Sequence, residues 1–331
     1  MSETLIKVEN LKKYFPVSKH KGLFVKAVDD ISFEVKEGEI LGVVGESGCG
    51  KSTMGRCLMK LTDITGGKIF FRGEDITGYN KKQMKEIRRH MQMVFQNPFS
   101  SFNPRHTIGK ALMDVAREYG MSREDADRKI SELVEVIGLD PVVLRRRPGE
   151  LSGGQLQRLA VARALVVNPE FILADEAVSA LDVSVQAQIL NMIMDLRRRY
   201  HLTMLFISHE LTVVEHISDH VIVMYLGAVM EMGTTEELFR NTLHPYSQAL
   251  LSAKPRETPD TVTDRIMLQG EVPNALNVPP FCRFCTRCPK FIPGKCDAVT
   301  PPLVNVGGDH YVACHLVSGS EGEAAGPVSD K

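Results

Sequence analysis

The chain alternates short apolar runs with amphipathic stretches, a pattern typical of strands that alternate with helices. The segments IKVENLKKYF and VKAVDDISFEVKEGEI alternate apolar with polar residues and predict half-buried strands, whereas the solid apolar run at residues 40–44 predicts a buried strand. Further strands are predicted at FILAD, TMLFIS and VIVMYL. The segment GGKIFFRGEDIT predicts a hairpin with a glycine turn.

Helices are predicted between these strands. One starts near Thr53, and a second covers about residues 121–138, where apolar residues recur at helical spacing. Others start after Ser152, extend over about residues 184–200, and cover ELTVVEHI. This alternation predicts an α/β fold with a parallel sheet and right-handed crossovers.

Composition narrows the class of protein. The 331 residues include 40 basic and 41 acidic side chains and are 43% hydrophobic, which excludes a disordered, collagen-like or coiled-coil chain. A net charge of -1 creates no long-range field that would attract nucleic acid or an anionic membrane. The start, MSETLIKVEN, has no leader pattern, and no apolar stretch approaches the roughly 18 residues of a membrane span, so we expect a cytosolic chain.

Composition changes beyond about Pro255, where prolines become frequent and periodic runs become rare. We therefore predict a main domain over residues 1–255, a C-terminal region over residues 256–316, and a disordered tail over residues 317–331.

A phosphate-binding loop is predicted where the buried strand at residues 40–44 gives way to a helix. Its glycines let successive backbone N–H groups converge on an anion, and the helix adds the positive end of its dipole. Lys51 is expected to reach the β and γ phosphates of a nucleotide, and the Ser52 hydroxyl to bind Mg²⁺. The alternative is a glycine-rich turn without a ligand. The predicted loop comprises Gly45, Glu46, Ser47, Gly48, Cys49, Gly50, Lys51, Ser52 and the following Thr53.

Two adjacent carboxylates, Asp175 and Glu176, end the apolar segment FILA. A buried strand is not expected to finish in two acids unless a cation or a reaction uses them. Asp175 is predicted to hold Mg²⁺ through water, and Glu176 to act as the general base toward an attacking water. The alternative is a solvated strand end.

The pentapeptide LSGGQ, with Ser152, Gly153, Gly154 and Gln155, lies between these two motifs. Together the three motifs resemble the ATP-binding subunit of ABC transporters. The resemblance implies a P-loop NTPase (RecA-like) ABC ATPase core with an antiparallel β subdomain and an inserted helical subdomain at about residues 97–158. It also implies that LSGGQ faces the γ phosphate held by a second subunit, so that two chains enclose two ATP molecules head to tail.

Other positions match the same family. Gln96 matches the glutamine that touches Mg²⁺ and the water, and His209 matches the switch histidine that contacts the γ phosphate and orients the general base. Residues 179–182, which end in Asp182, match the loop that crosses the dimer interface. Phe15 matches the aromatic residue that stacks on adenine, with the adjacent Tyr14 as the alternative.

The segments NPFSSFNPRHTIG and LHPYSQALLSAKP resemble the ATP-binding subunits of oligopeptide and dipeptide importers, a branch that includes nickel importers. This resemblance implies a second ATPase chain, identical or paralogous, two membrane permeases and an external peptide-binding protein. It places the chain peripherally at the cytoplasmic face of the membrane. A nickel or other small-solute importer is an alternative, as is a DNA-repair ATPase, although the stretch between Gln96 and Leu151 lacks the heptads of a coiled coil.

Five of the seven cysteines crowd into the C-terminal region, a density that indicates metal binding more than disulfides in a reducing compartment. The resemblance to the importers implies a [4Fe-4S] cluster on Cys282, Cys288, Cys296 and Cys314, with Cys285 as a substitute ligand. Zn²⁺ is the alternative, because four thiolates satisfy either group.

Overall fold

The computed structural model describes residues 3–17, 22–253, 266–268, 270, 273 and 275–318. The predicted disordered tail lies outside these residues except for positions 317 and 318. Within the described ranges, no helix combines the length and the apolar character that a membrane crossing requires. The chain divides into two compact units: one comprises Met1–Ile6, Glu34–Ile40 and Phe70–Ile207, and the other Lys7–Phe33, Leu41–Ile69 and Ser208–Lys331.

The first unit is built on three parallel strands, β6 (Met91–Val94), β7 (Phe171–Asp175) and β8 (Thr203–Ile207), with β7 in the middle. Every residue of β7 and β8 is buried, which explains their unbroken apolar runs. The short strand β5 (Glu74–Asp75) pairs antiparallel with Phe70 and Phe71, as the predicted hairpin requires.

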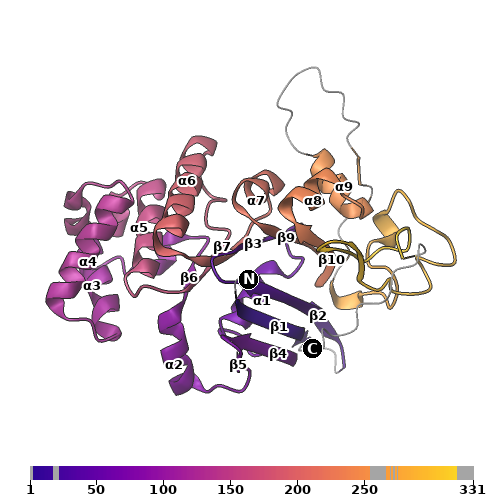
Figure 1. Ribbon diagram of the computed structural model, residues 1–331, viewed down its shortest axis with the longest axis horizontal. Helices are drawn as coiled ribbons and strands as arrows, with labels where there is room; N and C mark the ends of the chain where they lie inside the picture. The colour runs from indigo at the N-terminus through magenta and orange to yellow at the C-terminus, as the bar shows by residue number, and fades with distance from the viewer. Residues whose placement is uncertain are drawn as a thin grey trace. The chain divides into compact units, whose positions relative to one another are not determined.

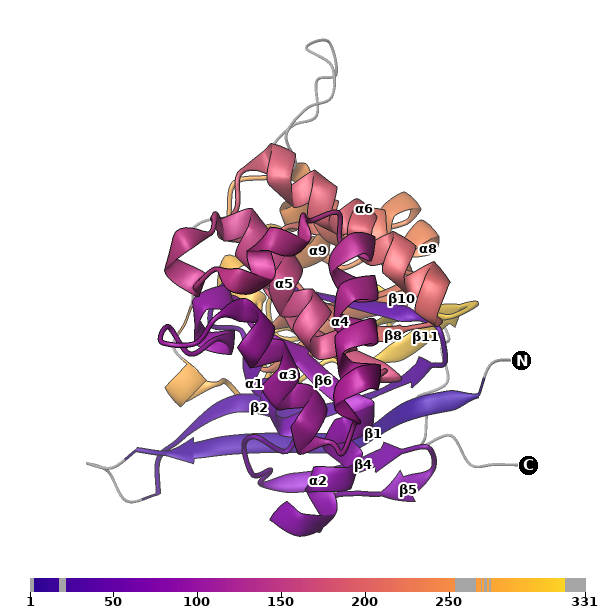
Figure 2. The same ribbon diagram turned by 90° about the vertical axis from the view of Figure 1, so that its left-hand side faces the viewer.

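Helices of the first unit carry most of its remaining residues. They are α2 (Lys81–His90), α3 (Ile108–Glu118), α4 (Arg123–Val136), α5 (Gly153–Leu165) and α6 (Val183–Tyr200), with 3-10 turns η1 (Pro98–Ser101), η2 (Pro141–Arg145) and η3 (Pro148–Glu150). Helices α3, α4 and α5 pack against one another (Figures 1 and 2). Their shared core contains Leu112, Leu133 and Leu156, each fully buried.

The second unit contains a mixed run of strands in the order β11-β12-β10-β9-β3. The strands β3 (Ile40–Val44) and β9 (His220–Tyr225) are parallel, but β10 (Ala228–Thr234), β12 (His310–Val312) and β11 (Val304–Gly307) are antiparallel to their neighbours. The predicted parallel sheet is therefore mixed in this unit. The chain reverses between β9 and β10 through Leu226 and Gly227, both at positive φ, which is the geometry of a tight hairpin turn.

The other elements of this unit surround these strands. The strands β2 (Phe24–Lys36), β1 (Thr4–Pro16) and β4 (Gly66–Phe71) are neighbours in that order. The helical elements are α1 (Lys51–Leu58), α7 (Leu211–Ile217), α8 (Thr235–Arg240), α9 (Pro245–Ser252), η4 (Ala275–Asn277) and η5 (Cys285–Arg287). One buried cluster joins Val44, Tyr225, Tyr246 and Phe284, so the core of this unit includes side chains from the C-terminal region.

Candidate nucleotide-binding and hydrolysis site

The predicted phosphate loop (residues 45–52) connects β3 to α1 in the second unit. Gly45, Gly48 and Gly50 all have positive φ, at 155°, 78° and 107°. A Cβ atom on Gly50 would lie 2.0 Å from the carbonyl oxygen of Ala27, and one on Gly45 would lie 2.2 Å from the carbonyl oxygen of Met224. Only glycine fits at these two positions, so the loop owes its shape to the glycines that the motif specifies.

Lys51 is buried, with 4% of its surface exposed. Its Nζ donates hydrogen bonds to the backbone oxygens of Gly45, at 2.7 Å, and Glu46, at 3.1 Å. Helix α1 begins at this lysine, and its N-cap, Gly50, offers no side-chain cap. A buried ammonium beside an uncapped helix N-terminus is suited to an anion such as phosphate.

The acidic pair lies in the first unit, at the end of β7. Asp175 is 4% exposed, and Glu176 follows it with a φ of 49°. The Gln96 side chain donates from Nε2 to Glu176 Oε2 over 2.8 Å, so these two predicted residues meet. The backbone N–H of Glu176 also donates to the carbonyl oxygen of Ile207, at 3.0 Å. Contacts from the ends of β6 and β8 therefore fix the position of this carboxylate.

The LSGGQ pentapeptide forms the start of α5. Ser152 is the N-cap and accepts from the backbone N–H of Gln155 at 3.3 Å, while Gln155 Oε1 accepts from the backbone N–H of Ser152 at 3.1 Å. This reciprocal capping box is a sufficient structural reason for Ser and Gln at these positions. A Cβ atom on Gly154 would lie 2.6 Å from Val185 Cγ1, so this glycine allows α5 to approach α6 closely.

Asp182 starts the neighbouring helix α6 as its N-cap. It accepts from the backbone N–H of Val185 at 3.0 Å and from the Ser184 hydroxyl at 2.6 Å. These hydrogen bonds, that from Ser184 first, hold the pKa of Asp182 below its usual range. The LSGGQ pentapeptide and the loop of residues 179–182 thus lie beside each other within the first unit.

His209 and Phe15 belong to the second unit. The His209 side chain is 45% exposed, and its Nε2 lies 3.7 Å from Glu210 Oε1. Phe15 is 39% exposed, whereas the adjacent Tyr14 donates its hydroxyl to Asp29. Burial, together with that hydrogen bond, raises the pKa of Tyr14 to about 12. Phe15 is therefore exposed, whereas Asp29 accepts a hydrogen bond from the Tyr14 hydroxyl.

Tyr246 of α9 and Arg287 of the C-terminal region touch the phosphate loop, and the sequence patterns did not identify either contact. Arg287 pairs with Glu46 through both guanidinium nitrogens, at 2.7 Å and 3.1 Å. The Tyr246 hydroxyl accepts from the backbone N–H of Glu46 at 2.9 Å. The one signal in the sequence is that arginines occupy two positions between the cysteines, at Arg283 and Arg287.

The five C-terminal cysteines lie in one lobe of the second unit, residues 281–316, which we call the cysteine lobe. Burial raises the pKa of Cys282 to about 12 and also raises that of Cys285, Cys288 and Cys314. Across the described ranges, no three His, Cys, Asp or Glu side chains are arranged to hold a metal ion. Burial thus favours the neutral form of the Cys282, Cys285, Cys288 and Cys314 thiols.

A cavity of about 700 Å³ in the first unit lies apart from these motifs. Its lining includes Arg72, Glu170 and His201 and contains none of the predicted site residues.

Comparison with known proteins agrees with this geometry. The chain matches the ABC transporter family over residues 28–179 and the oligopeptide/dipeptide transporter C-terminal region over residues 230–296. It is 48% identical over 326 residues to the oligopeptide transport ATP-binding protein AppF of Bacillus subtilis (strain 168), covering 96% of this chain and 98% of that protein. It is 45% identical over 327 residues to the dipeptide transport ATP-binding protein DppF of Escherichia coli (strain K12), covering 97% of each.

Solved structures agree on the fold. CbiO1 of Clostridium perfringens, part of the ABC transporter complex CbiONQ, superimposes with a TM-score of 0.65 at 23% identity over 72% of this chain and 92% of that one. The ATP-binding cassette MJ0796, as a dimer in a post-hydrolysis state with ADP and Pi, gives a TM-score of 0.63 at 27% identity over 70% of this chain and 98% of that one. The chain has the P-loop ABC ATPase fold and belongs to the ATP-hydrolysing, ATP-binding subunits of the oligopeptide and dipeptide branch of ABC transporters.

Proposed function

We propose that this chain hydrolyses ATP to power the import of oligopeptides or dipeptides across the cytoplasmic membrane. One observation carries the proposal: an intact phosphate loop with a buried Lys51 occurs in a chain that is 48% identical, over nearly its whole length, to an oligopeptide transport ATP-binding protein. The chain supplies the energy-converting step, and other subunits contact the peptide.

The roles of the individual residues follow from their chemistry. Lys51 and the backbone N–H groups of residues 45–53 bind the β and γ phosphates, and Phe15 stacks on the adenine. Ser52, Gln96 and Asp175 would hold Mg²⁺, which supplies charge neutralisation when bound.

Hydrolysis then depends mainly on positioning. Glu176 accepts the proton of the attacking water, and Gln96, 2.8 Å from that carboxylate, keeps it oriented. His209 contacts the γ phosphate. Little covalent chemistry falls to the protein, because phosphoryl transfer is assisted mostly by alignment and by neutralising charge.

The active state is a pair of chains. The LSGGQ pentapeptide and Asp182 of one chain complete the site of a second ATPase chain, identical or paralogous, so that closure encloses two ATP molecules. The dimeric MJ0796 structures, at 27% and 28% identity, support this arrangement. Opening and closing of the pair is the two-state change that would drive transport.

The remaining partners follow from the same branch. Two membrane permeases dock near Gln96, which places the chain peripherally at the cytoplasmic face of the membrane, and an external peptide-binding protein delivers the solute. We assign residues 1–255 to the nucleotide-binding domain and residues 256–316 to the C-terminal region of this branch. The similarity to AppF and DppF supports a peptide importer over a nickel importer or a DNA-repair ATPase.

We also propose a structural [4Fe-4S] cluster on Cys282, Cys288, Cys296 and Cys314, with Zn²⁺ as the alternative ligand group. The collection of all five thiols in one lobe supports this. Protein purified without oxygen is expected to be brown, with iron and acid-labile sulfide in equal amounts. Colourless protein with one bound zinc would favour the alternative, and protein with neither would refute both.

The test of the main proposal is purification of the tagged chain from its native membrane. We expect two permeases to copurify, and ATP hydrolysis by the complex in lipid vesicles to rise when peptide and its binding protein are added. Stimulation by nickel alone would indicate a nickel importer. Stimulation by DNA, without permeases, would refute the transport assignment.

A further inference from the structure

An ion pair joins the cysteine lobe to the phosphate loop. Arg287 Nη1 lies 2.7 Å from Glu46 Oε2, and Arg287 Nη2 lies 3.1 Å from Glu46 Oε1. The side chains are only 8% and 22% exposed. Two parallel charge-assisted hydrogen bonds make this the strong, geometrically specific form of an arginine-carboxylate contact.

The ion pair matters because Glu46 lies in the phosphate loop. Glu46 is the second residue of the phosphate loop, so its carboxylate is carried by the segment that we expect to wrap a triphosphate. A free carboxylate there would repel the anion, and because the Glu46 side chain is only 22% exposed, solvent would screen that repulsion weakly. Arg287 neutralises this charge through its ion pair with Glu46.

A second contact fixes the backbone of the same residue. The Tyr246 hydroxyl accepts from the N–H of Glu46, and the tyrosine ring is fully buried against Tyr225 and Phe284, with centroids 4.8 Å and 5.3 Å away. Its own N–H donates to His244 Nδ1 at 3.0 Å. The position of the hydroxyl is therefore set by packing and by a local hydrogen bond.

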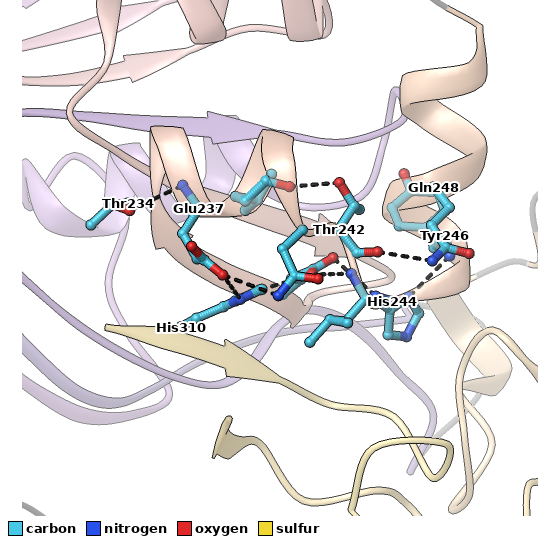
Figure 3. A network of polar contacts seen from close by, with 11 residues as sticks. Thr234, Glu237, Thr242, His244, Tyr246, Gln248 and His310 are labelled. Carbon is cyan, nitrogen blue, oxygen red and sulfur yellow. Dashed lines mark hydrogen bonds and ion pairs between the residues drawn. The ribbon is translucent and has the colours of Figure 1, made fainter. Parts of the chain in front are cut away.

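Tyr246 belongs to a network of polar contacts that includes His244 and His310 (Figure 3). The carboxylate of Glu231, on β10, is fully buried and accepts from the backbone N–H groups of Leu243 and His244, at 2.8 Å and 3.2 Å. It also lies 2.9 Å from Nε2 of His310, on β12. Strand β12 of the C-terminal region thus contacts, through His310, the carboxylate that holds the segment before Tyr246.

Two further hydrogen bonds fix the position of Arg287. It ends η5, where its N–H donates to the carbonyl oxygen of Phe284 at 3.0 Å, and its Nη1 also donates to the Tyr225 hydroxyl at 3.3 Å. Four residues earlier, Arg283 pairs with Asp29 of β2 at 2.6 Å. The cysteine lobe therefore contacts the rest of the second unit at two acidic residues, Asp29 and Glu46.

We propose that Arg287 is a positioning residue of the nucleotide site. It neutralises Glu46 and, together with Tyr246, holds the phosphate loop in a form that admits phosphates. The C-terminal region is then a working part of ATP binding, and any change that displaces η5 between Cys285 and Cys288 weakens it. This inference rests on the proposed function, because it assumes that the loop binds ATP.

The test compares full-length variants by calorimetry with ATP, with thermal unfolding as the check on folding. Arg287→Met removes the charge and is expected to weaken ATP binding about tenfold. The control is Lys290→Met, which removes one positive charge from an exposed site in the same lobe, where the lysine contacts Gln248. It is expected to change ATP affinity less than twofold.

A second variant tests whether Arg287 acts by neutralising Glu46 or only by supporting the structure. In the double variant Glu46→Gln, Arg287→Met, no uncompensated carboxylate remains, so most of the lost ATP affinity is expected to return. Where Arg287→Met does not fold, Arg287→Lys keeps the charge without the fork and is expected to lose about threefold.

Three results would overturn the inference: equal ATP affinity of Arg287→Met and Lys290→Met, a double variant no tighter than Arg287→Met, or an Arg287→Lys chain that binds as tightly as the wild type. Failure of the wild-type chain to bind ATP would refute the proposed function itself, and the inference with it.

Discussion

Replacement of Gly50 by alanine tests whether the glycines of the phosphate loop are required by geometry. A Cβ atom at this position would lie 2.0 Å from the carbonyl oxygen of Ala27, a backbone atom of β2, at a backbone φ of 107°. Gly48 provides a matched control in the same loop, because its φ is 78° but a Cβ atom there would meet nothing within 4 Å. Gly48→Ala therefore isolates the backbone strain, and Gly50→Ala adds the overlap.

The expected destabilisation follows from three contributions. A non-glycine residue in left-handed backbone costs about 1–2 kcal/mol, and the loss of glycine's freedom in the unfolded chain offsets roughly 0.4–1 kcal/mol. These leave about 1 kcal/mol for Gly48→Ala. At Gly50, contact at 3.0 Å would require a shift of at least 1.0 Å (3.0 minus 2.0) in the backbone of β2 or of the loop. Such overpacking adds about 1–3 kcal/mol, giving about 3 kcal/mol in total.

Urea unfolding of the nucleotide-free chain measures both effects, with circular dichroism as the signal and the two variants compared at equal protein concentration. We expect Gly50→Ala to lower the free energy of unfolding by about 2 kcal/mol more than Gly48→Ala does. Equal destabilisation by the two substitutions would refute the steric argument, since it would mean that the close approach to Ala27 imposes no cost.

Three further predictions concern the hydrolytic residues and a buried histidine. Glu176→Gln is expected to keep ATP binding but to trap a closed dimer, seen by size-exclusion chromatography; unchanged turnover would remove Glu176 from the role of base. Lys51→Ala is expected to abolish tight nucleotide binding by calorimetry, and wild-type affinity would contradict its assignment. Burial lowers the pKa of His244 to about 4, so the unfolded chain takes up the proton first, and stability falls between about pH 6.5 and pH 4 by up to about 3 kcal/mol. His244→Asn keeps a cap acceptor and should flatten that loss in urea unfolding; an identical pH dependence would argue against a buried neutral imidazole.

Helices were predictable from the sequence where one face of the helix is buried and the other is exposed. Helices α4 and α6 begin within about two residues of their predicted starts, because their apolar residues recur at helical spacing. Helix α2 gave no such signal, since Met84 is its one buried residue. Helix α3 does carry the spacing, with Ile108, Leu112 and Val115 buried, although it was not among the predicted helices.

The antiparallel part of the sheet was harder to predict. The turn between β9 and β10 uses Leu226 at positive φ, a residue that does not signal a hairpin turn in a sequence. Strand β12 joins the sheet by pairing Val312 with Glu231, a long-range contact between residues far apart in the chain. Register of this kind depends on tertiary packing and is not encoded in local periodicity.

In the candidate site, too, contiguous motifs were predictable from the sequence, whereas contacts between distant residues were not. The phosphate loop and the acidic pair could be found because each is a contiguous motif with its strand and helix beside it. The contact of Arg287 with Glu46 joins residues 241 positions apart, and no local sequence pattern predicts it. The cysteines were found by their density, but the burial of Cys282, Cys285, Cys296 and Cys314 could not be inferred from spacing.

The central claim is that ATP is cleaved only when two half-sites, one from each of two chains, close around it. The most direct test is the ATP hydrolysis rate per chain across a dilution series, with the molecular mass followed by light scattering and with the second ATPase chain added where the pair is heteromeric. We predict that the rate per chain falls toward zero as the protein becomes monomeric, and that a Ser152 variant lowers it at every concentration. A rate per chain that stays constant down to pure monomer, with the Ser152 variant as active as the wild type, would contradict the claim.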